Sequence, residues 1–186
     1  MSTPTPAESV TALARRYRLD LDMGGGEDDT GDWSLVPGIT AFQPKVTPTQ
    51  QDVTTYDAEG WSESAVTMLA WSVELTLAHR AHPVTGKFNA AQEALRRAAK
   101  MFAADSYVSV RYYDRHGADD AQQGMALVTW EPEGGGPDAV DTVKVTLTGS
   151  GPLVEIDNPA ADVEGMTLMA KGTTKTAAAP ATTGGK

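Results

Sequence analysis

The chain has 186 residues, 40% of them hydrophobic and 22% charged, which are ordinary values for a globular domain. They exclude a chain that is disordered throughout, and the length is enough for one domain with a real hydrophobic core. The net charge of −10 opposes tight binding to a polyanion such as nucleic acid, and the absence of cysteine excludes disulfides, thiolate nucleophiles and cysteine-bound zinc.

The two ends of the chain differ in composition from its middle. Residues 1–12 are rich in Ser, Thr, Pro and Ala, and residues 161–186 drift into a low-complexity run of Lys, Gly, Thr and Ala. Such segments have little apolar surface to bury, so we expect mobile ends. We predict a single domain at residues 1–160, with an N-terminal arm at 1–12, and a separate C-terminal tail at 161–186.

Neither a signal peptide nor a membrane anchor is expected. The first residues, MSTPTPAESV, contain no basic segment followed by an apolar one. No later window approaches the roughly 18 apolar residues that a membrane span requires. We therefore expect a soluble protein.

Alternation of apolar and polar residues predicts strands along most of the middle of the chain. The pattern is clearest at residues 67–77, where apolar side chains at every second position from Leu69 to Leu77 share one face. This is typical of a long strand with one buried side. Further strands are predicted at residues 17–21, 35–42, 107–114, 124–130 and 141–149, which makes the domain mainly β.

One segment, at about residues 89–104, is rich in helix formers instead. Asn89, with Gln92 three positions later, has the form of a capping box at the start of a helix. Apolar residues at helical spacing predict that one face of this helix packs on the sheet. These residues are Ala91, Leu95, Ala98 and Phe102.

Residues 43–65 form the least ordinary part of the sequence. The segment is long, polar and poor in aliphatic residues, yet it contains Tyr56 and Trp61. We predict a long polar loop, and loops of this length without a core of their own are usually functional or disordered. The two aromatic residues suggest that the loop docks on another surface.

The residues that could carry catalysis or bind a metal form no recognised motif. His79, His82 and His116 have no zinc-binding spacing and are interpreted as ordinary surface residues. The segment at 20–32 begins like a calcium-binding loop but lacks the ligand at its fifth position and the closing glutamate. Ser150 lies in TGSGP, without the GxSxG spacing of a nucleophile elbow. We therefore expect no catalysis, no metal and no cofactor.

Taken in order, these elements resemble the tail-tube (major tail) proteins of long-tailed bacteriophages with noncontractile tails. The likeness spans about residues 15–160. No single segment is specific, whereas the order and spacing of the segments are. They are DWSLVPGITAFQP, DVTTYDAEGW, LAWSVELTLAHR, QEALRRAAKMF, VRYYDRHG, GMALVTW and VKVTLTGSGPLVEIDNP.

The resemblance implies a β-sandwich or barrel flanked by one helix, with subunits that join sheet to sheet into hexameric rings stacked as a tube. In this family the inner sheets line a channel for DNA, and the long loop and part of a terminus reach the adjacent ring. The candidate inter-ring contacts are then Asp52, Tyr56, Asp57 and Trp61. An alternative for Trp61 is that it covers the core of its own subunit.

The resemblance also implies location and partners. The protein would be made in the cytoplasm of a bacterial host and incorporated into the virion tail. Its partners would be other copies of itself and the tape-measure, tail terminator and distal tail proteins. DNA would pass through the lumen without specific binding, helped by repulsion from acidic side chains; alternatively, the charge of −10 only keeps the free subunit soluble.

Two other functions stay open at this stage. The first is the tube subunit of a contractile tail or of a secretion or injection system. The second is a monomeric β-sandwich that binds a small ligand or a glycan.

Overall fold

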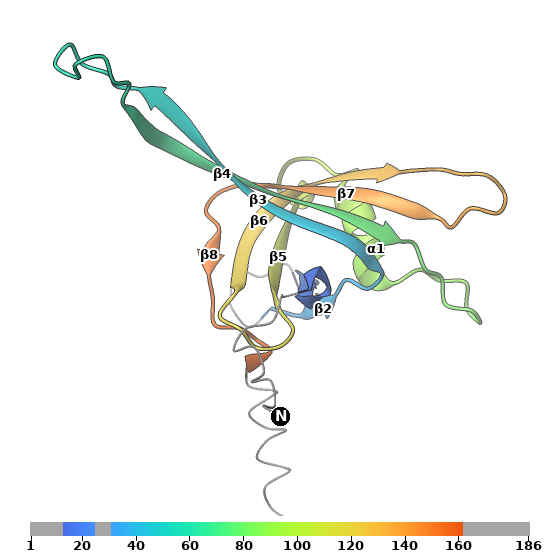
Figure 1. Ribbon diagram of the computed structural model, residues 1–186. Helices are drawn as coiled ribbons and strands as arrows, with labels where there is room; N and C mark the ends of the chain where they lie inside the picture. Colours follow the sequence, from blue (N-terminus) through green and yellow to red (C-terminus); the bar gives the residue numbers. More distant parts are fainter. Residues whose placement is uncertain (1–12, 25–30, 162–186) are drawn as a thin grey trace, which may run out of the picture.

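Eight strands form one antiparallel sheet in the computed structural model, which describes residues 13–24 and 31–161 (Figure 1). The strand order is β2-β1-β5-β6-β7-β4-β3, and β8 pairs with β6. The predicted mainly β fold with one flanking helix is confirmed. The elements are β1 (Tyr17–Asp22), β2 (Trp33–Leu35), β3 (Ile39–Asp52), β4 (Ser64–Ala78), α1 (Ala90–Ala98), β5 (Tyr107–Asp114), β6 (Ala121–Pro132), β7 (Thr142–Gly149) and β8 (Val154–Glu155).

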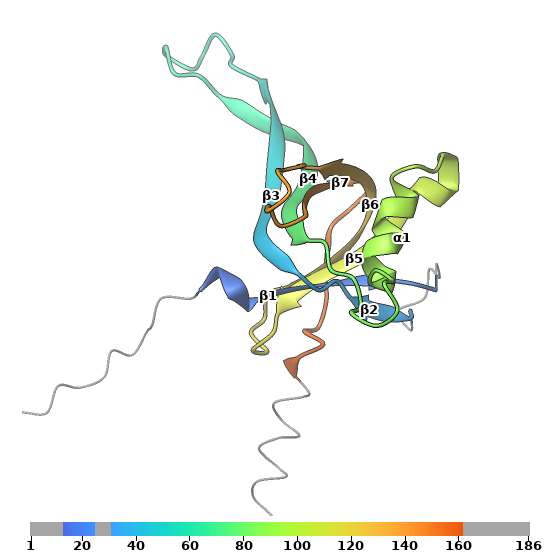
Figure 2. The ribbon, with the colours of Figure 1, turned by 90° about the vertical axis from the view of Figure 1, so that its right-hand side faces the viewer.

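The sheet curls until its two ends approach each other (Figure 2). The ring of Phe42 in β3 lies 5.1 Å from the ring of Tyr17 in β1 and 5.6 Å from that of Tyr112 in β5, measured between centroids. Within residues 13–24 and 31–161, no strand pairing joins β3 to β1 or β2. The fold is therefore a partly open barrel, and side chains close the seam between β1 and β3.

The core lies on the inner face of this sheet. Strands β4 and β7 pair in a register that sets buried aliphatic side chains directly opposite one another, which is the arrangement that stabilises a sheet most. The alternation predicted at residues 67–77 is confirmed over the part that pairs with β7. The opposing pairs are Val73–Leu147, Leu75–Val145 and Leu77–Val143.

Helix α1 begins as its sequence predicts. The side chain of Asn89 accepts hydrogen bonds from the amide groups of Ala91 at 2.9 Å and Gln92 at 3.4 Å. The Gln92 side chain is fully buried and donates to the carbonyl groups of Pro37 and Ala78, at 2.7 and 3.3 Å. Only half of the predicted capping box therefore forms, because Gln92 ties the helix to the sheet.

The end of this helix was predicted wrongly. It ends at Ala98 and not at about residue 104, and Ala103 has a φ of 53°, outside the helical region. Phe102 lies beyond the helix and is 89% exposed, so it does not belong to the buried face. The buried face consists of Ala91, Gln92, Leu95 and Ala98.

The strand predicted at residues 35–42 is two strands. Strand β2 ends at Leu35 and β3 begins at Ile39, because the chain turns at Gly38 with a φ of 85°. A side chain at Gly38 would place its Cβ only 2.7 Å from the carbonyl oxygen of Ala78. The remaining strands agree better: β1, β5 and β7 match the predicted ranges within one residue, and β6 is longer at both ends.

The predicted N-terminal arm at 1–12 and all but the first residue of the predicted tail at 161–186 lie outside the described residues. The division of the chain into a domain and a tail stays a prediction. Within the described ranges, no helix is both long enough and apolar enough to cross a membrane.

Trp71 is a large, buried side chain of the inner face and lies on two glycines. It is 6% exposed, and its indole N–H donates to the carbonyl of Gly151 at 3.1 Å. A Cβ added at Gly149 would lie 2.3 Å from the indole ring, and one at Gly124 would lie 2.6 Å from it. The absence of side chains on β6 and β7 at these points makes the space for Trp71.

We expect Gly149→Ala to lower the free energy of unfolding by about 1–3 kcal/mol, since the added methyl group overlaps the indole. Urea unfolding of the monomer, followed by tryptophan fluorescence, measures the change. Gly24→Ala is the matched control, because its Cβ would meet no atom of a described residue closer than 3.5 Å. Equal midpoints for the two variants would contradict this account of the Trp71 site.

Candidate self-assembly surface

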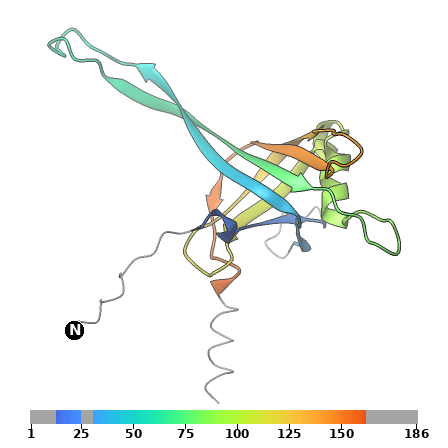
Figure 3. The same ribbon diagram turned by 45° about the vertical axis from the view of Figure 1, so that its right-hand side comes forward.

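Strands β3 and β4 form a hairpin that extends well beyond the body of the protein (Figures 1 and 3). They pair from Ile39–Leu77 to Asp52–Ser64. Strand β7 pairs with β4 only from Ser72 onward. The outer part of the hairpin, residues 46–71, therefore has no strand beside it other than its own partner, and we call it the arm.

The prediction of a loop at residues 43–65 was wrong in extent. Strand β3 continues to Asp52, and the irregular segment, here called the tip, is only residues 53–63. Pro44 and Pro48 argue against a central strand, because proline cannot donate to a hydrogen-bond ladder. Strand β3 is an edge strand that pairs with β4 alone, and its open side requires no donor.

Two β-bulges shape the hairpin. The register shifts by one residue at Thr40 in β3 and at Thr67 in β4. In both cases the extra threonine donates its hydroxyl to a carbonyl on the partner strand, to Thr76 at 3.1 Å and to Thr49 at 3.3 Å. Bulges bend a strand and increase its twist, so they help to direct the arm away from the body.

The face of the hairpin that forms part of the core continues along the arm. Residues directly opposite each other in an antiparallel pair share a face, and Val46 lies opposite Trp71, whereas Leu69 lies opposite Pro48. Trp71 is buried, but Leu69 is 71% exposed and Val46 is 54% exposed. The prediction that Leu69 belongs to the buried face is therefore wrong for the isolated chain, because the body ends at Trp71.

The tip presents two aromatic side chains to solvent. Tyr56 is fully exposed and Trp61 is 80% exposed, so Trp61 does not cover the core of its own subunit. The amide of Ala58 donates to Thr55 at 3.2 Å, and the amide of Trp61 donates to Ala58 at 2.9 Å. These turn hydrogen bonds give the segment that carries the two aromatic residues a defined backbone conformation.

Asp52 and Asp57 have different positions in this segment. The Asp52 carboxylate accepts hydrogen bonds from the hydroxyl and the amide of Thr54, the latter at 2.8 Å. The Thr54 hydroxyl in turn accepts from the amide of Glu63 at 2.9 Å, which closes the base of the tip. Asp57 makes no hydrogen bond or ion pair with any described residue. Asp52 therefore organises the tip, and Asp57 is available for a partner.

The four predicted contact residues thus lie together at the end of the arm, but the exposed aliphatic residues behind them were not predicted. Val46, Val66 and Leu69 are all more than half exposed. The signal that could have identified them is the length of the alternating pattern. A strand of 15 residues, such as β4, is longer than one wall of a small barrel needs.

Of the three histidines, His79 is engaged by residues of its own chain. His79 lies 2.9 Å from Asp141 and stacks on Phe88, with ring centroids 3.9 Å apart. In the described part of the chain, no group of three or more His, Asp or Glu residues is arranged to hold a metal ion.

Comparison with known proteins identifies similar solved structures. No protein-family model matches the chain, and no curated protein matches it. The tail of an empty gene transfer agent particle matches with a TM-score of 0.59 at 14% identity, over 78% of this chain and 99% of that chain. The SPP1 tail tube matches with a TM-score of 0.59 at 13% identity, over 84% and 86% of the two chains.

A third match is the baseplate of the anti-feeding prophage, with a TM-score of 0.51 at 10% identity, over 78% of this chain and 97% of that chain. At such low identity these likenesses establish the fold and not the activity. The chain has the fold of tail-tube proteins, which confirms at the level of fold the resemblance inferred from sequence.

The hydrogen bonds at the base of the tip predict a pH dependence. The pKa of Asp52 is lowered from 3.8, first by the hydrogen bond from the Thr54 hydroxyl and then by the one from its amide. The contribution of the carboxylate to tip order is therefore present above pH 3.8 and is lost as the pH falls through the lowered pKa.

In NMR spectra we expect the amide proton of Thr54 to shift with a midpoint below pH 3.8. The step should vanish in Asp52→Asn, which cannot ionise. A midpoint at or above 3.8 would show that the hydrogen bonds do not hold the carboxylate in its charged form.

Proposed function

We propose that this protein is a structural virion protein that polymerises as stacked hexameric rings into the tube of a phage tail. The observation that carries the proposal is the arm. Its apolar face continues the core beyond the body, and its tip exposes Tyr56 and Trp61. A contiguous patch of exposed apolar surface is typical of an interaction site.

The structural neighbours support this reading. The gene transfer agent structure is a tail described with C6 symmetry, and the SPP1 structure is a tail tube. By analogy, the chain forms rings of six that stack along one axis. The tube then belongs to the tail of a virion, assembled from subunits made in the host bacterial cytoplasm, and it meets the tape-measure, tail terminator and distal tail proteins.

The lumen of such a tube must let DNA pass without retaining it. The chain carries 25 acidic against 15 basic residues. Phosphate binding gains most of its affinity from neutralisation by Lys and Arg, so an acidic lining repels DNA and a basic lining would hold it. The charge balance supports passage without specific binding.

Within this proposal, the arm connects one ring to the next. Tyr56 and Trp61 are the anchors, because aromatic side chains that become buried at the centre of an interface carry most of the binding free energy. Asp57 adds a charge that can pair with a partner, and Asp52 holds the segment in shape.

A tube subunit of a contractile or injection system is the second candidate. The likeness to the anti-feeding prophage baseplate favours it, because that structure shares the fold over most of both chains. A sheath gene beside the gene for this protein would support the second candidate, and a tape-measure gene without a sheath gene would support a noncontractile tail.

We expect the double variant Tyr56→Ala with Trp61→Ala to fold as a monomer that forms no tubes at concentrations where the wild-type chain does. Both side chains are exposed, so their loss should leave the unfolding midpoint unchanged. Negative-stain images of the concentrated protein and circular dichroism measure the two properties.

The control is Thr55→Ala with Ser62→Ala, which alters the same tip without removing an aromatic ring and should still assemble. Normal tubes from the aromatic double variant would remove the arm from the interface. A wild-type chain that stays monomeric and binds a small ligand saturably would instead support the ligand-binding alternative.

A further inference from the structure

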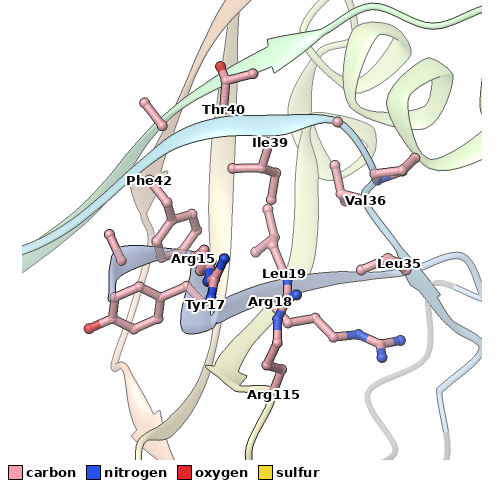
Figure 4. A pocket seen from close by; sticks show the side chains of 14 residues that line it. Arg15, Tyr17, Arg18, Leu19, Leu35, Val36, Ile39, Thr40, Phe42 and Arg115 are labelled. Atoms are coloured by element: carbon pink, nitrogen blue, oxygen red, sulfur yellow. The ribbon is translucent and has the colours of Figure 1, made fainter. Parts of the chain in front are cut away.

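A pocket of about 580 Å³ opens at the seam between β1 and β3 (Figure 4). Pockets of about 300–1,000 Å³ accommodate small ligands, so this one has room for an aromatic side chain. It lies beside the link between β2 and β3 and the first residues of β3, from Leu35 to Phe42. It is therefore at the base of the hairpin, at the opposite end from the tip.

The pocket combines an apolar lining with positive charge. Tyr17, Ile39 and Phe42 come from the two strands that border the seam. The charged residues that line it are Arg15, Arg18 and Arg115, and no described Asp or Glu lines it. In a chain of net charge −10, a pocket with three arginines and no acid among its lining residues favours an acidic occupant.

Neighbouring ion pairs do not neutralise most of this charge. Asp114 and Asp120 pair with Arg16, at 3.0 and 2.7 Å, and Arg16 is not among the pocket residues. Arg18 pairs with Asp20 at 3.1 Å. Arg15 and Arg115 are exposed and form no ion pair with a described residue.

One backbone hydrogen bond and one side-chain ion pair fix the segments that carry the arginines. The amide of Arg115 donates to the carbonyl of Arg16 at 2.9 Å, which joins the turn after β5 to the segment before β1. The Asp114 hydrogen bond is the largest cause of the raised pKa of Arg16, so this joint remains charged and paired. Arg15 and Arg115, whose guanidinium groups form no ion pair with a described residue, are therefore attached to backbone segments that Arg16 holds together.

The tip has the complementary chemistry. Residues 52–63 include four acids and no Lys or Arg, together with the two exposed aromatic residues. Of the acids, Asp52 is engaged within the tip, but Asp57 and Glu59 lie between Tyr56 and Trp61. Glu59 and Gly60 have positive φ values of 48° and 87°, so the chain turns between the two aromatic residues.

We propose that the tip of one copy of this chain inserts into the seam pocket of another copy. An aromatic ring of the tip then lies against Tyr17 and Phe42, and Asp57 and Glu59 face Arg15 and Arg115. This inference rests on the proposed function, and it adds the acceptor site to it. Arginine beside an inserted aromatic ring contributes a cation–π contact as well as an ion pair.

The placement of the two sites has a consequence for assembly. Tip and pocket lie at opposite ends of the hairpin, so a copy that donates its tip still offers a vacant pocket at its other end. A contact between two different surface patches repeats from copy to copy instead of stopping at a dimer. This is the kind of contact that extends a tube along its axis.

Charge reversal tests the pairing. We expect Arg15→Glu with Arg115→Glu to raise the concentration needed for tube formation about tenfold or more, because like charges then face each other. Asp57→Lys with Glu59→Lys should have the same effect. A chain that carries all four changes should assemble near the wild-type concentration, since each tip again meets a pocket of opposite charge.

The control for net charge is Lys87→Glu with Lys100→Glu, both exposed and outside the pocket, which should assemble normally. Failure of the fourfold variant to regain assembly, with its circular dichroism unchanged, would overturn the inference. Pellet assays at graded protein concentrations provide the measurement.

Cross-linking tests the contact without altering any charge. Because the chain has no cysteine, Ala14→Cys in the pocket and Ser62→Cys in the tip introduce the only thiols. We expect oxidation of assembled tubes to give a ladder of linked chains, and the pair Ser62→Cys with Val140→Cys to give none. Val140 is 72% exposed and does not line the pocket.

The outcomes separate this inference from the proposed function. Tubes that form but do not cross-link between positions 14 and 62 would overturn the pocket assignment alone. A chain that forms neither rings nor tubes at any concentration would overturn both.

Discussion

Strand β4 is the element on which the rest of the structure depends, because it pairs on both sides and serves two environments. Its second half pairs with β7 and forms a wall of the core, and its first half pairs only with β3 and forms the arm. The same alternation runs through both halves, with Trp71 at the boundary. Burial of a Val or Leu side chain contributes about 1.5–3 kcal/mol. On the arm, no described residue of the same chain supplies that burial for Val46, Val66 or Leu69.

The alternating strands could be predicted from sequence because period-two patterning is local. The buried side of the strand that contains Val73, Leu75 and Leu77 can be recognised without knowing which strand lies beside it. Residues 43–52 could not be recognised in the same way. Polar residues and two prolines are compatible with a strand only at an edge, and whether a strand is an edge depends on the order of the whole sheet.

The helix shows the same limit on a smaller scale. Asn89 caps it as local rules predict, because both of its acceptor contacts are within three residues. The side chain of Gln92 instead makes tertiary hydrogen bonds. It donates to the carbonyl groups of Pro37 and Ala78, which are far away in sequence. The candidate site divides likewise: the tip is one segment and was predicted, whereas Arg15 and Arg115 are brought together only by the pairing of β1 with β5.

In the proposed assembly, the overall negative charge and the local charge complementarity between tip and pocket act at different distances. A net charge of −10 repels other copies at long range, but at physiological salt this repulsion is screened beyond about 8 Å. In the proposed contact, the acidic tip meets a pocket whose charged lining residues are Arg15, Arg18 and Arg115. In this proposal, general repulsion disfavours random association, and the arginines of the seam pocket select the acidic tip as the segment that binds there.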